Sequence, residues 1–542
     1  MPRIPRATLV HPLPDLSPPL ARSAGLFGLA TMASRILGLV RDQVVAFYFG
    51  AGDANDAFRV ASRIPNLVRD LFAEGAMSAA FVPTFTHELA TGGKPQAWAL
   101  ANRVITALVL ITGLLVVAGL VFAHPLTRAF AADFDDVPGK LELTVMLARI
   151  MLPFLTLVAL AAVFMGMLNA LGHFFIPALS PAMFNVATIV IVVVLVPFAP
   201  AMGIDPIVLV AIATLVGGLG QLVVQWAPLG REGYSYRPAL GFDDPALRRV
   251  LFLMGPGTIG MAATQINILV NTQFAAGEGT GAVSWLDYAF RLMYLPIGLF
   301  GVSIAAASTP ALARLAASSD LVRMRGTIGS AIGLMLVLNI PSTVGLIALA
   351  APIVALIFEH GRFTAADTIA TARALQFYAI GLVAYSVVRI VTPAFYALHL
   401  SRIPVTASIV SVVANIVFNV ILVNVMGYVG LALGTSLAAM VNAAVQVWLL
   451  RRHLGGIEGS RIAVTFVKTC AAAAAMGAAA WYVDWWLARA FPEQSLAVQA
   501  MRVGGAILVA LAVLAITASI LRIREFEDAR NLVLGRLRRL SR

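Results

Sequence analysis

The sequence has few charged residues and almost no cysteine. Only 12% of its 542 residues are charged, 60% are hydrophobic, and the mean hydropathy is +0.90. A soluble domain averages about 25% charged residues, so this composition excludes a water-soluble or disordered chain and predicts an integral membrane protein. The single cysteine, Cys470, excludes an intramolecular disulfide and a metal site built on paired cysteines.

Sequence motifs for ATP hydrolysis, catalysis or metal binding are also lacking. There is no Walker A sequence, and the seven histidines lack metal-ligand spacing, so we expect no enzyme activity and no cofactor. Residues 255–260 match G-x-G-x-x-G, but no strand precedes them, which indicates packing of small residues between helices. Asp133, Asp135 and Asp136 lack the glycine of a calcium loop and indicate an external acidic loop.

Long apolar segments fill most of the chain. A spanning helix needs about 20 mostly apolar residues. Fourteen segments qualify, at residues 23–49, 56–85, 98–123, 143–171, 175–197, 206–228, 248–276, 281–312, 325–358, 368–398, 404–425, 429–450, 462–489 and 500–522. They show no period of two, which excludes a β-barrel. The sequence therefore predicts an all-α integral membrane protein with 14 transmembrane helices.

The net charge of +12 comes from basic residues concentrated in alternate loops. With a cytoplasmic N-terminus, the cytoplasmic loops and tails hold 22 Lys and Arg residues, and the loops of the opposite side hold four, Arg128, Lys140, Arg362 and Arg489. The positive-inside rule then predicts that both termini are cytoplasmic. It also favours anionic lipids at the cytoplasmic face, and not nucleic acid, as the partner of these charges. Residues 1–22 are expected to be disordered, and residues 523–542 to form an interfacial amphipathic helix or, alternatively, a solvated tail.

The chain repeats itself at an offset of 227 residues. Glycines and prolines recur at this offset, as in Gly50 and Gly277, Gly52 and Gly279, Pro83 and Pro310, and Pro125 and Pro352. A six-helix unit predicts two lobes, residues 23–230 and 231–452, related by a pseudo-twofold axis along the membrane normal, as in transporters with parallel repeats. Residues 453–522 then add two further helices.

Charged residues inside the predicted spans are the main functional clue. They are Arg35, Arg41, Asp42, Arg59, Arg63, Arg69, Asp70, Glu74, Asp287, Arg291, Arg373 and Arg389. A central arginine costs about 2.5–3.5 kcal/mol on insertion scales, so these groups must face water or one another. One interpretation of these charges is that they form ion pairs which hold helices together, above all at Asp42, Arg59, Arg63 and Asp70. The other interpretation is that guanidinium groups bind an anionic substrate, because the carboxylates are too few to neutralise every arginine.

Several of these residues lie in stretches that closely resemble the lipid II flippase family MurJ (MviN) of the MOP exporter superfamily. The stretches are Thr31–Gly38, Arg41-Asp42, Asp56–Phe58, Ile64–Ala76, Phe81–Pro83, Val283–Trp285, Tyr288-Ala289, Arg291-Leu292, Gly361–Thr364 and Pro393–Tyr396. The resemblance implies fourteen helices, two six-helix lobes and a central cavity that closes alternately on each side. It also implies that helices 13 and 14, residues 453–522, form a groove for a lipid tail.

The resemblance implies roles for individual residues. The cavity arginines that would bind substrate are Arg35, Arg41, Arg69 and Arg291, and the acidic gate and helix-pairing positions are Asp42, Asp56 and Glu74. Phe290 and Tyr294 stand where relatives can have carboxylates, which puts gate pairing on that helix in doubt. Cation-site positions of some members carry neutral side chains here, at Asn271, Asn415, Asn419 and Thr435. Sodium binding is therefore expected to be weak or absent, and polar contacts between helices are expected there instead.

The expected function is the transfer of lipid II, an undecaprenyl-pyrophosphate-linked disaccharide-peptide, to the periplasmic leaflet by alternating access for peptidoglycan synthesis. We expect a monomer in the bacterial inner membrane, driven by the membrane potential. One alternative is an exporter of another polyprenyl-linked glycan or of small molecules in the same superfamily. An intramembrane transferase would need metal-binding carboxylates near a loop, and a scaffold would not need buried charges.

Overall fold

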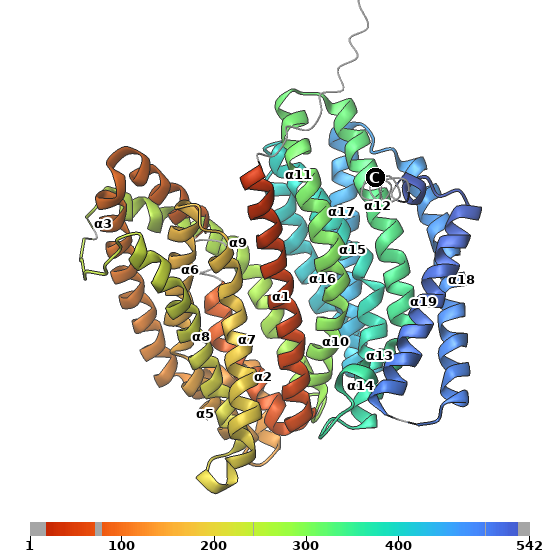
Figure 1. Ribbon diagram of the computed structural model, residues 1–542, viewed down its shortest axis with the longest axis horizontal. Coiled ribbons are helices and arrows are strands. Elements are labelled where there is room, and N and C mark those ends of the chain that lie inside the picture. The colour runs from red at the N-terminus through yellow and green to blue at the C-terminus, as the bar shows by residue number, and fades with distance from the viewer. Residues whose placement is uncertain (1–17, 71–77, 242, 494, 529, 531–542) are drawn as a thin grey trace, which may run out of the picture. The chain divides into compact units, whose positions relative to one another are not determined.

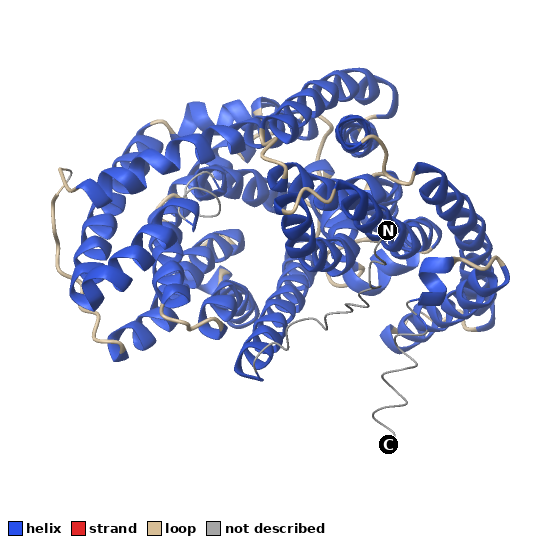
Figure 2. Cartoon of the chain, turned by 90° about the horizontal axis from the view of Figure 1, so that it is seen from above, coloured by secondary structure: helices blue, strands red, loops and turns tan. Residues whose placement is uncertain are grey.

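The computed structural model describes residues 18–70, 78–241, 243–493, 495–528 and 530. All regular structure in these residues is helical (Figures 1 and 2). In the same residues, ten helices are long and apolar enough to cross a membrane, or eleven if the bent pair α14 and α15 forms one span. The prediction of an all-α, multi-pass membrane protein is confirmed.

The chain forms two compact units, and each contains segments from distant parts of the sequence. Unit 1 comprises Met1–Arg41, Val68–Val117 and Pro153–Gly257. Unit 2 comprises Asp42–Leu67, Ala118–Leu152 and Thr258–Arg542. The helices α1 (Pro18–Phe49), α2 (Asp53–Arg69), α3 (Ser78–Val121) and α9 (Pro245–Ala276) pass from one unit into the other.

Unit 1 is built around an aromatic core. Its other helices are α6 (Phe154–Ala170), α7 (Phe175–Leu195) and α8 (Pro206–Arg231), and its core contains Phe81, Phe85, Phe154 and Phe164. α3 is divided by a kink at Gly93, whose φ of 67° suits glycine. Outside the spans, Glu232 accepts hydrogen bonds from His173 and Lys94, which lower the pKa of its carboxyl group.

Unit 1 also contains the short 3-10 helices η3 (Val196–Phe198) and η4 (Pro200–Met202), and unit 2 holds the remaining helices. They are α4 (Ala123–Phe130), η2 (Ala132–Asp136), α5 (Lys140–Met151), α10 (Ala282–Pro296), η5 (Ile297–Gly301), α11 (Val302–Ala317), α12 (Leu321–Ala348), α13 (Ala350–Phe358), α14 (Ala365–Ile380), α15 (Leu382–Ala397), α16 (Arg402–Met426), α17 (Tyr428–Leu454), α18 (Gly459–Ala490) and α19 (Leu496–Ile520). η5 is a π-helical turn that joins α10 and α11 into one apolar segment of 36 residues. α12 packs on α18, and α18 packs on α19.

Helices overlap every apolar segment that the sequence predicts, although the second segment also crosses residues 71–77, which lie outside the described residues. The total of fourteen spans stays a prediction. The sequence predicts a loop between the third and fourth segments. This prediction is wrong, because the stretch is largely helical and contains α4, η2 and the start of α5. Of the head expected to be disordered, residues 1–17 lie outside the description, and α1 begins at Pro18.

The start of the C-terminal tail packs against unit 2. Ile523 and Glu525 are 2% and 5% exposed. Glu525 accepts hydrogen bonds from Arg461, at 3.0 and 3.1 Å, and from Thr465 at 3.0 Å, both on α18. The basic end of the predicted amphipathic helix, residues 531–542, lies outside the described residues. Its interfacial placement stays a prediction.

Two glycines allow the end of α1 to contact the loop after α13. The backbone N–H of Arg362 donates to the carbonyl of Phe47 at 2.9 Å. Gly50 and Gly361 flank this bond with φ of +60° and +63°, a region that L-residues with a side chain rarely adopt. A Cβ on Gly361 would lie 2.3 Å from the carbonyl oxygen of Phe47. This close approach explains why Gly361 needs to be glycine.

We expect Gly361→Ala to lower the melting temperature of the purified protein much more than Gly139→Ala does. Gly139 has a φ of +80° with nothing near the added Cβ, so its replacement costs only the backbone strain, about 1–2 kcal/mol. Gly361→Ala adds the clash with backbone that cannot move freely. Equal losses in a thermal-shift measurement would contradict the contact.

Candidate functional site

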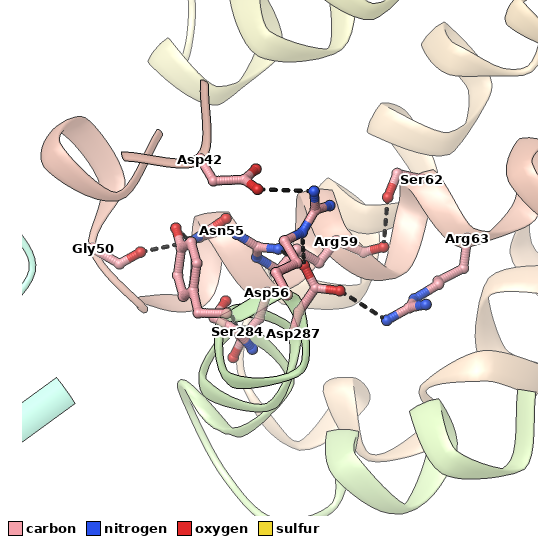
Figure 3. Close-up of polar contacts among 11 residues, drawn as sticks. Asp42, Gly50, Asn55, Asp56, Arg59, Ser62, Arg63, Ser284 and Asp287 are labelled. Carbon is pink, nitrogen blue, oxygen red and sulfur yellow. Dashed lines mark hydrogen bonds and ion pairs between the residues drawn. The ribbon is translucent and has the colours of Figure 1, made fainter. Parts of the chain in front are cut away.

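Two carboxylates and three arginines cluster in unit 2. We call this group the arginine cluster; its members are Asp42 on α1, Arg59 and Arg63 on α2, and Asp287 and Arg291 on α10. Figure 3 shows Arg59 and Arg63 of α2 reaching toward Asp287. The spacing of α2 residues by four places both guanidinium groups on one face of the helix.

Asp287 is the centre of the arginine cluster because it binds all three arginines. Its Oδ2 accepts hydrogen bonds from Nη1 of Arg59 and from Nε of Arg291, the latter at 3.0 Å. Its Oδ1 accepts from Nη2 of Arg63 at 3.1 Å. The Asp287 side chain is 16% exposed. One carboxylate thus shares its charge among three cations.

Arg291 connects Asp287 to the first helix. Its Nη1 lies 2.8 Å from Oδ2 of Asp42, whose side chain is 6% exposed. Phe290 and Tyr294 do not supply a carboxylate to this helix, and Asp287, which lies one turn before Arg291, is a carboxylate that pairs with it. The i, i+4 spacing of these two residues was the signal available in the sequence.

Asp56 has a different role, because it joins the beginnings of α2 and α10. Its side chain is fully buried. It accepts hydrogen bonds from the backbone N–H of Gly281 at 2.7 Å and of Ser284 at 3.0 Å, and from Oγ of Ser284 at 2.6 Å. A carboxylate in this position caps the N-terminus of α10, where backbone N–H groups have no partner within the helix.

Lys140 also belongs to this junction, although the sequence predicts that it lies in an external loop. It is 4% exposed, and its Nζ lies 2.7 Å from Asp53 and 3.4 Å from Asp56. It also lies over the ring of Phe134 at 4.1 Å. A lysine in the first turn of α5 opposes the helix dipole, and the two aspartates offset this unfavourable interaction.

The other predicted substrate-binding arginines lie in unit 1. Arg41 donates to Asn185 on α7 at 3.1 Å and lies over the ring of Phe184 at 5.1 Å. Arg69 binds Asp70 at 2.7 and 2.9 Å and lines a cavity of about 200 Å³. Arg35 is exposed on α1. Glu74 lies outside the described residues.

The arrangement brings some predicted residues together. Arg291 and Asp42 meet in the arginine cluster, and Asp56 lies in the neighbouring junction. Arg35, Arg41 and Arg69 belong to unit 1 and Arg291 to unit 2. The assignment of these four arginines to one substrate site stays a prediction.

The four neutral cation-site candidates contact one another in unit 2. Asn419 donates to Asn271 and, at 3.1 Å, to Asn415, and Asn415 lies 3.5 Å from the hydroxyl of Thr435. Three of them line a cavity of about 380 Å³, together with Asp287 and Arg63. These contacts are of the kind expected for polar groups that join helices within a membrane.

Comparisons with known proteins identify the family. The family described as "Lipid II flippase MurJ" matches residues 45–500. A "Probable lipid II flippase MurJ" of Vibrio cholerae is 35% identical over 492 residues, which cover 88% of this chain and 92% of that protein. A "Lipid II flippase MurJ" of Burkholderia cenocepacia is 33% identical over 427 residues, with 78% and 82% covered.

Solved structures agree with this match. "Lipid II flippase MurJ, inward closed conformation" superposes with a TM-score of 0.73 at 26% identity and covers 92% of this chain and 99% of that one. An inward-facing multidrug resistance MATE family transporter of the MOP superfamily has a TM-score of 0.66 at 18% identity, over 80% and 99% of the two chains, a likeness of fold alone. The family match, the two sequence relatives and the 26%-identical structure agree, and we conclude that this chain belongs to the MurJ family of lipid II flippases.

Proposed function

We propose that this protein carries lipid II from the cytoplasmic to the periplasmic leaflet of the bacterial inner membrane by alternating access, for peptidoglycan synthesis. The observation that carries the proposal is the family match over residues 45–500. No bond is made or broken, so the protein is a transporter and not an enzyme. The lipid tail stays in the bilayer, and the charged head group crosses through the protein.

The head group needs cationic partners because its pyrophosphate has about two negative charges. Guanidinium groups bind phosphate oxygens through two parallel N–H bonds and keep their charge at every physiological pH. We assign this role to Arg35, Arg41, Arg69 and Arg291. The Arg291 side chain is 42% exposed although it contacts two carboxylates, and this exposure supports its assignment as a group that a further anion can reach.

The proposed architecture has fourteen helices in two parallel lobes, residues 23–230 and 231–452, followed by α18 and α19 as the groove for the lipid tail. Contacts at the repeat offset support it. Asp53 and Thr280, which are 227 residues apart, form a hydrogen bond of 2.6 Å. The helices α2 and α10, which correspond to each other in the proposed repeat, thus meet at their N-terminal ends. Helices beside a pseudo-twofold axis meet in this way.

The proposed driving force is the membrane potential. Moving one charge across 100 mV is worth about 2.3 kcal/mol, so two negative charges that leave a negative cytoplasm gain at most about 5 kcal/mol. Flipping in proteoliposomes should therefore slow when the potential is collapsed at a fixed pH difference. No nucleotide is required in this scheme.

The decisive experiment depletes the protein in a strain that depends on it and measures lipid-linked precursors. Accumulation of lipid II in the cytoplasmic leaflet is the expected result. Accumulation of a different polyprenyl-linked glycan would favour the alternative substrate of the same superfamily. A drug-sensitive strain with normal precursors would point to a multidrug exporter instead.

The orientation can be tested with two single-cysteine variants in a Cys470→Ser background. Ser235, in the exposed loop between α8 and α9, should be cytoplasmic. Asp135, in η2 with a 51% exposed side chain, should be periplasmic. We expect a membrane-impermeant maleimide to label Asp135→Cys in intact spheroplasts and Ser235→Cys only after lysis. The reverse pattern would contradict cytoplasmic termini.

A further inference from the structure

We propose that Asp287 is a resident anion of the arginine cluster, which occupies the guanidinium groups until the substrate pyrophosphate displaces it. This inference rests on the proposed function and names a specificity-determining residue for it. The two oxygens of Asp287 accept from three arginines, which is the pattern that a phosphate group would adopt with the same donors.

The three arginines are not equivalent. Arg59 has a side chain 7% exposed, and its guanidinium carbon lies 4.1 Å from the ring centre of Tyr288. It needs a permanent carboxylate because a buried, unpaired charge costs several kcal/mol. Arg63 and Arg291 are 33% and 42% exposed. Arg59 therefore anchors Asp287, and Arg63 and Arg291 are the two that an incoming anion can reach.

Among the five side chains that define the arginine cluster, three arginines face two aspartates, so these five groups together carry one positive charge. A pyrophosphate has about two negative charges and Asp287 has one. The pyrophosphate therefore competes favourably with Asp287 for Arg63 and Arg291. Asp287 cannot leave, because it is covalently attached and bound to Arg59. In the release step of the transport cycle, the Asp287 carboxylate is close enough to bind Arg63 and Arg291 again and so to displace the pyrophosphate.

The displaced carboxylate has a place to go. Asp287 and Arg63 line the cavity of about 380 Å³, whose wall also contains the amide side chains of Asn267 and Asn271. Amide N–H groups stabilise a carboxylate by hydrogen bonding, and the cavity provides room for rotation of the side chain. In this proposal, the side-chain amides of Asn267 and Asn271 donate hydrogen bonds to Asp287 while the substrate is bound.

The test compares Asp287→Asn with the wild type in two assays. Lipid II binding is titrated in detergent at fixed salt, and flipping of fluorescent lipid II is measured in proteoliposomes. Without the competing charge, Asp287→Asn should bind lipid II about tenfold more tightly, a change of about 1.4 kcal/mol. Its flipping should nevertheless be lost, because nothing expels the product. Asp287→Glu keeps the charge and should bind within about threefold of wild type.

A second pair of variants avoids the cost of leaving buried Arg59 unpaired. Arg59→Gln alone keeps the resident anion, whereas Arg59→Gln with Asp287→Asn removes it without changing the net charge from wild type. The double variant should bind lipid II about tenfold more tightly than Arg59→Gln. If the Asp287→Asn single variant does not insert into the membrane, this comparison still tests whether Asp287 competes with the substrate. A helix-locking role alone would leave affinity unchanged or reduced.

Two results would overturn the inference. Equal or weaker binding in both asparagine-containing variants, with wild type binding normally, would reject Asp287 as a competing anion and leave the proposed function intact. Absence of lipid II binding by the wild type would overturn the proposed function and this inference with it.

Discussion

Asp56→Ala is expected to remove most of the protein from the membrane fraction. The substitution deletes three hydrogen-bond acceptor contacts to α10 and leaves the buried Lys140 with Asp53 as its remaining carboxylate. Removing one partner of a buried charge pair costs about 3–5 kcal/mol, which is a large part of the stability of most proteins. Quantitative immunoblots and thermal shift of the surviving protein measure the loss.

The matched control for Asp56 is Asp53→Ala. Asp53 contacts the same lysine, but its side chain is 45% exposed, so water replaces much of what it loses. Asp56→Asn should fall between the two, because its carbonyl oxygen still accepts from the backbone of α10. If Asp53→Ala reduced the protein as much as Asp56→Ala, the capping role would be wrong.

Arg291→Ala is expected to abolish flipping, by a factor of about 100 or more, or about 2.7 kcal/mol in the barrier. Arg291 contacts both carboxylates of the arginine cluster and is its most exposed cation. We expect the same of Arg41→Ala and Arg69→Ala. Lysine at position 291 should restore only part of the activity, because an ammonium group lacks the planar, two-point donor geometry. Growth complementation and proteoliposome flipping measure the effect.

The control for this series is Arg373→Ala, an exposed arginine of α14 outside the arginine cluster, which should be mild. Insertion of Arg291→Ala should be normal, because removing a charge from a span lowers the cost of insertion. Full complementation by two of the three alanine variants would reject the assignment. Loss of the variants from the membrane would show instead that these arginines lock helices.

Hydropathy predicted where the helices lie, because lipid accepts only segments whose backbone groups bond internally. It could not predict the pairing of charges. The sequence shows that Asp287 is a charged residue within a predicted span. It does not show which of the three arginines Asp287 contacts. Lys140 looked like a loop residue because the helical turns before it, α4 and η2, are too short to register as apolar spans. Pairing depends on helix rotation, which a hydropathy pattern leaves open.

Under the proposed repeat, one half of this chain would not be able to replace the other. At the offset of 227, Arg59 corresponds to Leu286 and Asp287 to Val60. Each half therefore brings its charges to positions where the other half is apolar. Two copies of the first half would place Val60 opposite Arg59, where the complete chain has the carboxylate of Asp287. The proposed repeat therefore implies that pairing of identical halves would be penalised and that the complementary pair would be favoured, as in an obligate heterodimer whose subunits have been joined into one chain.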